Sequence, residues 1–282
     1  MVSQKRVVAI HDISCIGRCS LTVALPIISA TGVECSVIPT AVLSTHTGGF
    51  TGYTYRDMTE DITPIVDHWV SLGLTFDSIY TGFLGSREQI EIVKETISRL
   101  RRPDTLAVVD PAMADNGKMY PIFDMAFAKE MASLCAVADV IVPNITEACF
   151  MLGKEYKEGP YTPDYILGLM KDLCAMGAKK VVLTGVYYED GKLGAATYDS
   201  ETGKTSTYFH GVIPGYYHGT GDVFASALVA ALMNGKSLEE SAAIAVEFTV
   251  GSIVRTYEAE TDVKYGVNFE AGLYDLTRSI RQ

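Results

Sequence analysis

Residues 217–224 read YHGTGDVF and stand directly before a segment whose apolar side chains recur at helix spacing. This spacing predicts a helix over residues 223–234, with an apolar stripe made of Val223, Phe224, Ala227, Leu228, Ala231 and Leu232. GTGD therefore falls on the first turn, where backbone N–H groups lack helical partners and the helix dipole adds partial positive charge. Two glycines at that turn let an anion such as phosphate approach those amides.

The carboxylate of this segment has two interpretations. Asp222 could accept a proton from a hydroxyl group that attacks a bound phosphate. It could equally do no more than favour the helix dipole, with Gly219 and Gly221 serving the turn. The familiar nucleotide motifs do not decide between them, because the sequence has no GxxxxGK[ST] segment and Phe224 occupies the last glycine position of GxGxxG.

Strands and helices alternate upstream of this helix. Short β-branched runs predict strands at residues 6–10, 37–42, 78–80, 105–109, 140–142 and 179–185. Helix spacing predicts helices at residues 20–30, 62–72, 88–100, 123–136, 146–152 and 165–176. An antiparallel strand pair at 193–198 and 205–209 precedes helices at 223–234, 238–257 and 269–280. The pattern predicts an α/β fold with a mostly parallel sheet, in a single domain over residues 1–282.

Composition narrows the possible partners. Thirty-four acidic residues against 23 basic ones give a net charge of −11, and no basic block is present. This balance argues against nucleic-acid and anionic-membrane partners. The six cysteines lack metal-site spacing and are expected to be free. The chain has no apolar stretch of about 18 residues and enters a strand without a signal peptide, so we expect a cytoplasmic protein.

Several segments together resemble a known enzyme group. VVDPAMADNGKMY (residues 108–120), IVPNITEACFML (141–152) and GTGD occur in this order and resemble the ribokinase-like superfamily of small-molecule kinases. LSTHTGGFTG (43–52) is similar to the substrate loop of pyridoxal kinases, and YTGFLGS (80–86) to their TGYLGS-type segment. The resemblance runs from Val7 to about Thr256 and implies a three-layer sandwich with helices on both faces of the central sheet.

The resemblance implies ATP and Mg²⁺ as cofactors. Asp222 would be the base toward the substrate's hydroxymethyl group, and the amides of Gly219, Thr220 and Gly221 would form the anion hole. Two acids, Asp110 and Glu147, would organise Mg²⁺. The residues expected to contact ATP are Asn144, Glu147, Thr184, Tyr120, Gly219 and Gly221. The polar loop 114–121 could close over ATP as a lid. A monovalent-cation requirement stays open.

Simpler roles are also open for these nucleotide-side residues. Asp110 could be a turn residue before Pro111, and Glu147 a first-turn helix acid. Asn144 could cap its helix, which is compatible with a nucleotide contact.

The resemblance also implies that four residues bind the B6 vitamer, namely Asp12, His46, Thr47 and Phe83. Thr47 would bond a polar group of a pyridine ring, and Phe83 would pack on its face. His46 could instead fix its own loop by hydrogen bonding. Where many pyridoxal kinases carry Ser, this chain has Asp12, and Phe83 replaces their Tyr. A carboxylate at that position favours a cationic amine, so pyridoxamine would be preferred to pyridoxal.

The leading hypothesis is therefore an ATP- and Mg²⁺-dependent kinase, commonly dimeric in this family, that phosphorylates the 5′-hydroxyl of pyridoxal, pyridoxamine or pyridoxine. The alternative is a kinase of the same superfamily acting on hydroxymethylpyrimidine or another small molecule, although those pyrimidine kinases typically read GTGC where this chain has Asp222. A non-catalytic vitamer or nucleotide binder is a second alternative. A nicotinamide-dependent oxidoreductase is the weakest, since its glycine fingerprint is absent.

Overall fold

A mixed nine-stranded sheet runs through residues 4–282, the part of the chain that the computed structural model describes. Its strands are β1 (Arg6–Ser14), β2 (Glu34–Leu43), β3 (Tyr55–Asp57), β4 (Ser78–Thr81), β5 (Leu106–Val109), β8 (Val140–Ile141), β9 (Lys180–Val186), β10 (Lys192–Asp199) and β11 (Thr205–Gly211). The order is β11-β10-β9-β8-β5-β4-β1-β2-β3. Strands from β9 to β2 run parallel to their neighbours, and β10, β11 and β3 pair antiparallel.

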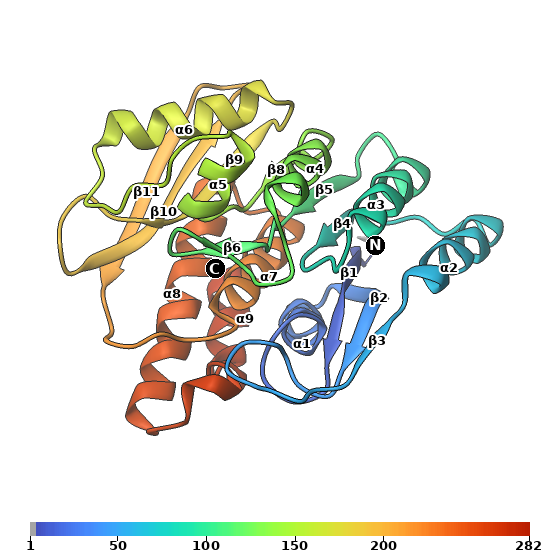
Figure 1. The fold of residues 1–282 in the computed structure, drawn as a ribbon, viewed down its shortest axis with the longest axis horizontal. Coiled ribbons are helices and arrows are strands. Elements are labelled where there is room, and N and C mark those ends of the chain that lie inside the picture. The colour runs from blue at the N-terminus through green and yellow to red at the C-terminus, as the bar shows by residue number, and fades with distance from the viewer. Residues whose placement is uncertain (1–3) are drawn as a thin grey trace.

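Helices cover both faces of this sheet (Figure 1). One layer holds α2 (Thr59–Ser71), α3 (Arg87–Leu100), α4 (Met125–Cys135), α5 (Ile145–Met151) and α6 (Pro163–Ala175). The other holds α1 (Leu21–Ala30), α7 (Thr220–Met233), α8 (Leu238–Glu258) and α9 (Leu273–Arg281). The three-layer arrangement and the mostly parallel sheet confirm the predicted fold class.

Alternation along β1 explains why there are two cores. Val8 and Ile10 pack with the first helix layer, whereas Val7 and Ala9 pack with the second. Successive side chains of a strand point to opposite faces, so a central parallel strand covered on both sides is apolar throughout. This is why RVVAI is a continuous apolar run rather than an alternating one.

Several helices begin where the sequence supplies a capping side chain. The side chains of Ser86, Asp124, Asn144, Thr162 and Ser237 each accept a hydrogen bond from a backbone N–H in the first turn of α3, α4, α5, α6 and α8. Such a bond satisfies an amide that has no helical partner, which fixes where the helix starts.

Two sequence expectations needed correction, and one strand was not expected. Residues 55–57 form the edge strand β3, because their backbone pairs with β2. The loop 114–121 contains a two-stranded ribbon of β6 (Ala114–Asp115) and β7 (Lys118–Met119) around Asn116-Gly117. The helix α7 is buried over residues 223–231 rather than along one stripe, because it lies between the sheet, α1 and α8.

No helix within residues 4–282 is both long enough and apolar enough to span a membrane. The parallel strands bring their carboxyl ends to a single edge of the sheet, and the polar segments that follow them meet there.

Candidate active site

The start of α7 is shaped by a glycine that no other residue could replace without rearrangement. Gly219 is the N-cap and has φ of 74°. A Cβ built on it would lie 2.0 Å from the carbonyl oxygen of Arg18, in the turn between β1 and α1. A Cβ on Gly221, by contrast, would meet no heavy atom within 4 Å. The first glycine therefore permits close backbone packing, and the second leaves open space beside the helix start.

Asp222 lies in the first turn of α7 and is partly buried. Burial raises the pKa of its carboxyl to about 7, a backbone hydrogen bond from Ser20 opposes this rise, and the charge of Asp12 adds to it. A carboxyl with a pKa near neutrality can accept a proton at physiological pH and release it afterwards, which suits a general base. The geometry thus places a titratable carboxylate beside backbone amides that favour an anion.

Asp12 belongs to a buried network at the end of β1. Its side chain is 4% exposed, and its two carboxylate oxygens accept hydrogen bonds from Ser20 Oγ at 2.5 Å and Ser14 Oγ at 3.0 Å. Burial raises the pKa of Asp12, while the two hydroxyls and nearby His46 lower it. The charge of Asp12 also raises the pKa of Asp222, while the substrate and base roles of the two acids stay predictions.

The two acids expected at the metal site lie next to each other. Burial raises the pKa of Asp110, and the charges of Glu147 and Asp222 raise it further. Burial also raises the pKa of Glu147 to about 8, although three backbone amides donate to its carboxylate. These amides belong to Met113, Ala114 and Asn144.

This acid pair fits a magnesium ion bound largely through water. Among the described residues, neither a hydrogen bond nor a basic side chain lowers the pKa of Asp110, so nothing offsets the cost of ionising it. A divalent cation would relieve that repulsion. Residues 4–282 contain no group of three or more His, Cys, Asp or Glu side chains suited to a metal. Mg²⁺ keeps several waters and needs only one or two carboxylates, which is compatible with these two acids, and their metal role stays a prediction.

Glu147 also has a structural role that the simpler interpretation anticipated. Asn144 Oδ1 accepts from the Glu147 amide at 3.0 Å, and Glu147 Oε2 accepts from the Asn144 amide at 2.9 Å. This capping box starts α5. Asn144 therefore caps its helix, and its side-chain amide donates to the carbonyl of Ala114 at 2.8 Å. Thr184, at the end of β9, lies beside Asn144 in a parallel bridge.

The segment expected to act as a lid is an ordered β-hairpin. Asn116 and Gly117 have φ of 49° and 74°, values that suit an Asn-Gly two-residue turn. The amide of Gly117 donates to Thr146 Oγ1 at 2.9 Å, which ties the turn to α5. Figure 1 shows the ribbon between α5 and the start of α7. Tyr120 follows it, 36% exposed, and burial together with Glu147 raises the pKa of its phenol. A lid motion of this segment stays a prediction.

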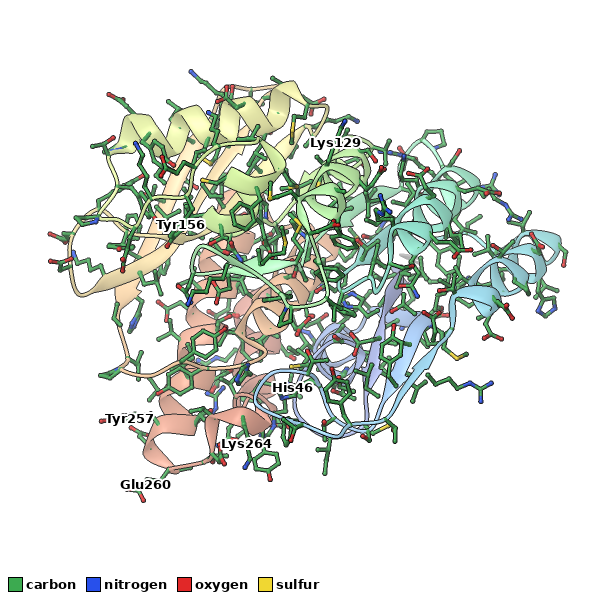
Figure 2. All side chains as sticks on the ribbon, viewed as in Figure 1. His46, Lys129, Tyr156, Tyr257, Glu260 and Lys264 are labelled. Atoms are coloured by element: carbon green, nitrogen blue, oxygen red, sulfur yellow. The ribbon has the colours of Figure 1, made fainter. Side chains whose placement is uncertain are left out.

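His46 holds its loop in place. Its Nε2 lies 2.6 Å from the carbonyl oxygen of Lys264, and its Nδ1 accepts from the amide of Gly48 at 3.1 Å. These partners assign the proton to Nε2, and Figure 2 shows His46 beside Lys264. Both ring nitrogens are thus engaged by backbone groups, which favours the loop-fixing interpretation. Thr47, one residue on, is exposed.

Phe83 follows β4 and is half-buried. Its ring centroid lies 5.6 Å from that of Phe123, so one side of the ring packs within the protein. The register of β4 with β1 places it near Asp12, because the amide of Gly82 donates to the carbonyl of Ile10. Contact between Phe83 and a substrate ring stays a prediction.

Sequence reasoning missed several residues of this region. The hydroxyl of Ser20 donates to Asp12, yet its sequence signal was only that of a helix start. Tyr216 donates to Asp115 Oδ2 at 3.1 Å, which joins the segment before GTGD to the hairpin. The ring of His218 packs against the rings of His46 and Tyr216. No motif marks these side chains, because their role depends on loops that meet only in three dimensions.

Several proteins that this chain resembles are described as kinases. The chain is 31% identical to the pyridoxine kinase of Bacillus subtilis over 193 residues, which is 66% of each protein. It superposes with a TM-score of 0.93, at 38% identity, on a candidate phosphomethylpyrimidine kinase of Bacteroides thetaiotaomicron crystallised with pyridoxal, covering 97% of this chain and 96% of that one. The pyridoxal kinase of Lactobacillus plantarum gives a TM-score of 0.89 at 29% identity, covering 98% of both chains.

The ribokinase-like fold and the kinase relatives define a small-molecule kinase, a phosphotransferase with an alcohol group as acceptor. The chain belongs to the phosphomethylpyrimidine kinase family, whose model matches residues 25–267. The individual roles assigned to the site residues remain predictions.

Proposed function

We propose that this protein transfers the γ-phosphoryl group of ATP to the 5′-hydroxyl of a B6 vitamer. The observation that carries the proposal is Asp222, a carboxyl of pKa about 7 in the first turn of α7, beside amides that face open space at Gly221. The relatives named as pyridoxine and pyridoxal kinases, and the Bacteroides protein crystallised with pyridoxal, support a vitamer as acceptor.

In this proposal separate residues act as the base, bind the transferred phosphoryl group and hold the metal. Asp222 accepts the proton of the 5′-hydroxyl as its oxygen attacks the γ-phosphorus atom, and the bond to the β,γ-bridging oxygen breaks, leaving ADP. The amides of Gly219, Thr220 and Gly221 stabilise the charge on the transferred group. Asp110 and Glu147 would hold Mg²⁺, and the bound ion would supply positive charge to offset that of the phosphates.

The remaining residues orient the two substrates. Asn144, Thr184 and Tyr120 would contact the nucleotide, and the hairpin 114–121 would exclude water. Asp12, Thr47 and Phe83 would orient the ring, while His46 fixes the loop that carries Thr47. A homodimer, which the family resemblance implies, and a cytoplasmic location and a single domain over 1–282, which the sequence predicts, are further predictions.

A second candidate is phosphorylation of a hydroxymethylpyrimidine. It is favoured by the family model, which is described as phosphomethylpyrimidine kinase and spans residues 25–267. The same base and anion hole would serve both reactions, because both acceptors carry a hydroxymethyl group on a planar ring. Two features favour the vitamer over the pyrimidine, namely the substrate loop LSTHTGGFTG and Asp222, where the pyrimidine kinases typically carry Cys.

A panel of acceptors tests the proposal. With ATP and Mg²⁺, we expect the purified protein to phosphorylate pyridoxal, pyridoxamine and pyridoxine with kcat/KM at least tenfold above that for hydroxymethylpyrimidine. Coupled ADP release and mass spectrometry of the product measure this. Turnover of the pyrimidine alone would replace the substrate, and turnover of none of the four would refute the proposed function.

The identity of residue 12 should set the preference among vitamers. A carboxylate at Asp12 favours a cationic amine, so we expect kcat/KM for pyridoxamine to exceed that for pyridoxal, and Asp12→Ser to reduce the ratio. Pyridoxine and pyridoxal, which lack the amine, provide the internal control. The ratio of their kcat/KM values should change less in Asp12→Ser. Equal kcat/KM for pyridoxamine and pyridoxal, unaltered in Asp12→Ser, would contradict this role.

A further inference from the structure

The substrate loop, residues 43–52, is in contact with two histidine rings at Gly48. The amide of Gly48 donates to His46 Nδ1 at 3.1 Å. A Cβ built on Gly48 would lie 2.7 Å from both Nδ1 and Cε1 of His218, and 3.4 Å from Nδ1 of His46. Packed carbon atoms prefer separations of about 3.5–4.0 Å. The ring of His218 therefore occupies the space that a side chain at position 48 would need.

His218 belongs to the segment that is proposed to act on the phosphoryl group. It directly precedes Gly219, the N-cap of α7. Its ring centroid lies 5.3 Å from that of His46 and 5.2 Å from that of Tyr216, whose ring is nearly perpendicular to it. Tyr216 is in turn bonded to Asp115 of the hairpin. One half-buried side chain thus joins the substrate loop to the start of α7.

A second attachment holds the same loop from the segment 262–266. His46 Nε2 lies 2.6 Å from the carbonyl oxygen of Lys264, and Figure 2 shows these two residues side by side. The ring of Phe50 packs against that of Tyr265 at 5.5 Å, with Lys264 Nζ 5.9 Å from the Phe50 centroid. This attachment fixes the loop to the C-terminal part of the chain, whereas His218 fixes it to the first turn of α7.

We propose that His218 is a positioning residue whose ring sets the separation between the substrate loop and the first turn of α7. The inference rests on the proposed function, in which Thr47 orients the vitamer while residues 219–222 act on its 5′-hydroxyl and on the phosphoryl group. The reacting atoms must meet at about 3–3.5 Å, and a misplacement of about 1 Å can lower the rate about 10²-fold. A rigid ring between the two segments supplies that constraint.

The same packing explains why position 48 is a glycine. Gly48 is not among the glycines of positive φ, so the backbone itself does not disfavour alanine there. The obstacle to a methyl group is the ring of His218, 2.7 Å away. The inference therefore predicts that residues 48 and 218 are energetically coupled, because a methyl group at 48 is harmful only while the ring is present.

A double-mutant cycle tests this coupling. Gly48→Ala should lower kcat/KM for pyridoxamine about tenfold in the parent, because the loop must move away from the ring. In the His218→Ala background the same substitution should change kcat/KM by less than about twofold, because the space is vacant. His218→Ala alone should lower kcat/KM for pyridoxamine, while the KM for ATP and the melting temperature stay near the parental values. A merely structural role would lower the melting temperature instead.

Pyridoxamine binding without nucleotide gives a readout that does not depend on turnover. Isothermal titration calorimetry on the four proteins of the cycle should give Kd values with the same non-additivity as kcat/KM. Tyr265→Ala is the matched control, because it removes a ring that packs on the same loop at Phe50 but leaves the His218 ring beside Gly48. Gly48→Ala should keep its full effect in that background.

The cycle remains informative if Gly48→Ala does not fold. Circular dichroism should then show a folded chain in the double variant with His218→Ala and an unfolded chain in the double variant with Tyr265→Ala. Failure of His218→Ala to restore folding would overturn the inference, because the ring would not be the obstacle at position 48.

The outcomes separate this inference from the proposed function. If the parent phosphorylates pyridoxamine, an equal effect of Gly48→Ala with and without the His218 ring would overturn the role of His218 alone. Parental kcat/KM in His218→Ala would do the same, as would a KM for ATP that rises as much as the KM for pyridoxamine. A parent that neither binds nor phosphorylates any B6 vitamer would refute the proposed function, and this inference with it.

Discussion

Asp222→Asn should lower kcat by about 10²–10⁴-fold, the usual effect of removing a positioned general base. Asparagine is nearly isosteric with aspartate but cannot accept the proton of the attacking hydroxyl. Because the backbone at this turn is unchanged, the KM for the vitamer should change little. Steady-state kinetics with pyridoxal and pyridoxamine at saturating ATP and Mg²⁺ measure both quantities.

The parent enzyme should show the matching pH dependence. Asp222 has a pKa of about 7 and acts only when ionised, so kcat/KM should fall below pH 7 by a factor approaching ten per pH unit. The charge of Asp12 contributes to that raised pKa, so Asp12→Ser should move the midpoint to lower pH. An acid limb that stays at the same pH in Asp12→Ser would show that the charge of Asp12 does not affect the pKa of Asp222.

Stability provides the control for Asp222→Asn. The carboxyl has a higher pKa in the folded protein than its ordinary value of 3.8, so folding takes up a proton in that interval. Its contribution to stability is present at low pH and is lost as pH rises through 7. The asparagine variant should therefore melt no lower than the parent at pH 8. A folded variant with parental kcat would place the base elsewhere.

Gly219→Ala should abolish most activity and destabilise the protein. Its φ of 74° costs a residue with a Cβ about 1–2 kcal/mol, and the new methyl group would lie 2.0 Å from the Arg18 carbonyl oxygen. The backbone of one of the two segments must move, which displaces the amides that face the phosphoryl group. Loss of one such donor commonly lowers kcat by about 10²–10³-fold. Thermal melting and kcat measured on the same samples test both effects.

Gly221→Ala is the matched comparison in the same turn. A Cβ there meets no heavy atom within 4 Å, and alanine is favoured over glycine within a helix by about 1 kcal/mol. The variant should therefore melt at or above the parental temperature. Its KM for ATP should nevertheless rise, because the methyl group enters the space proposed for the phosphate. Parental ATP kinetics in Gly221→Ala would show that the phosphate lies elsewhere.

Much of the scaffold was predictable because its signals are local. The alternation of β-branched runs and helix-spaced segments predicted the parallel sheet, and GTGD fell at the start of α7 as expected. Capping residues such as Asn144 also marked their helices correctly. The edge strand β3 and the ribbon β6–β7 were missed, because each is only two or three residues long and exists through pairing with another segment.

The sequence by itself determined the fold class, the position of the anion-accepting helix start and the identity of the carboxylate within it. Only the tertiary structure decided how that carboxylate is held. Gly219 against Arg18 and the approach of Asp12 to Asp222 join residues about 200 positions apart. Propensity and spacing act within one or two helical turns, whereas the pKa of a buried acid depends on every group that the folded chain brings near it.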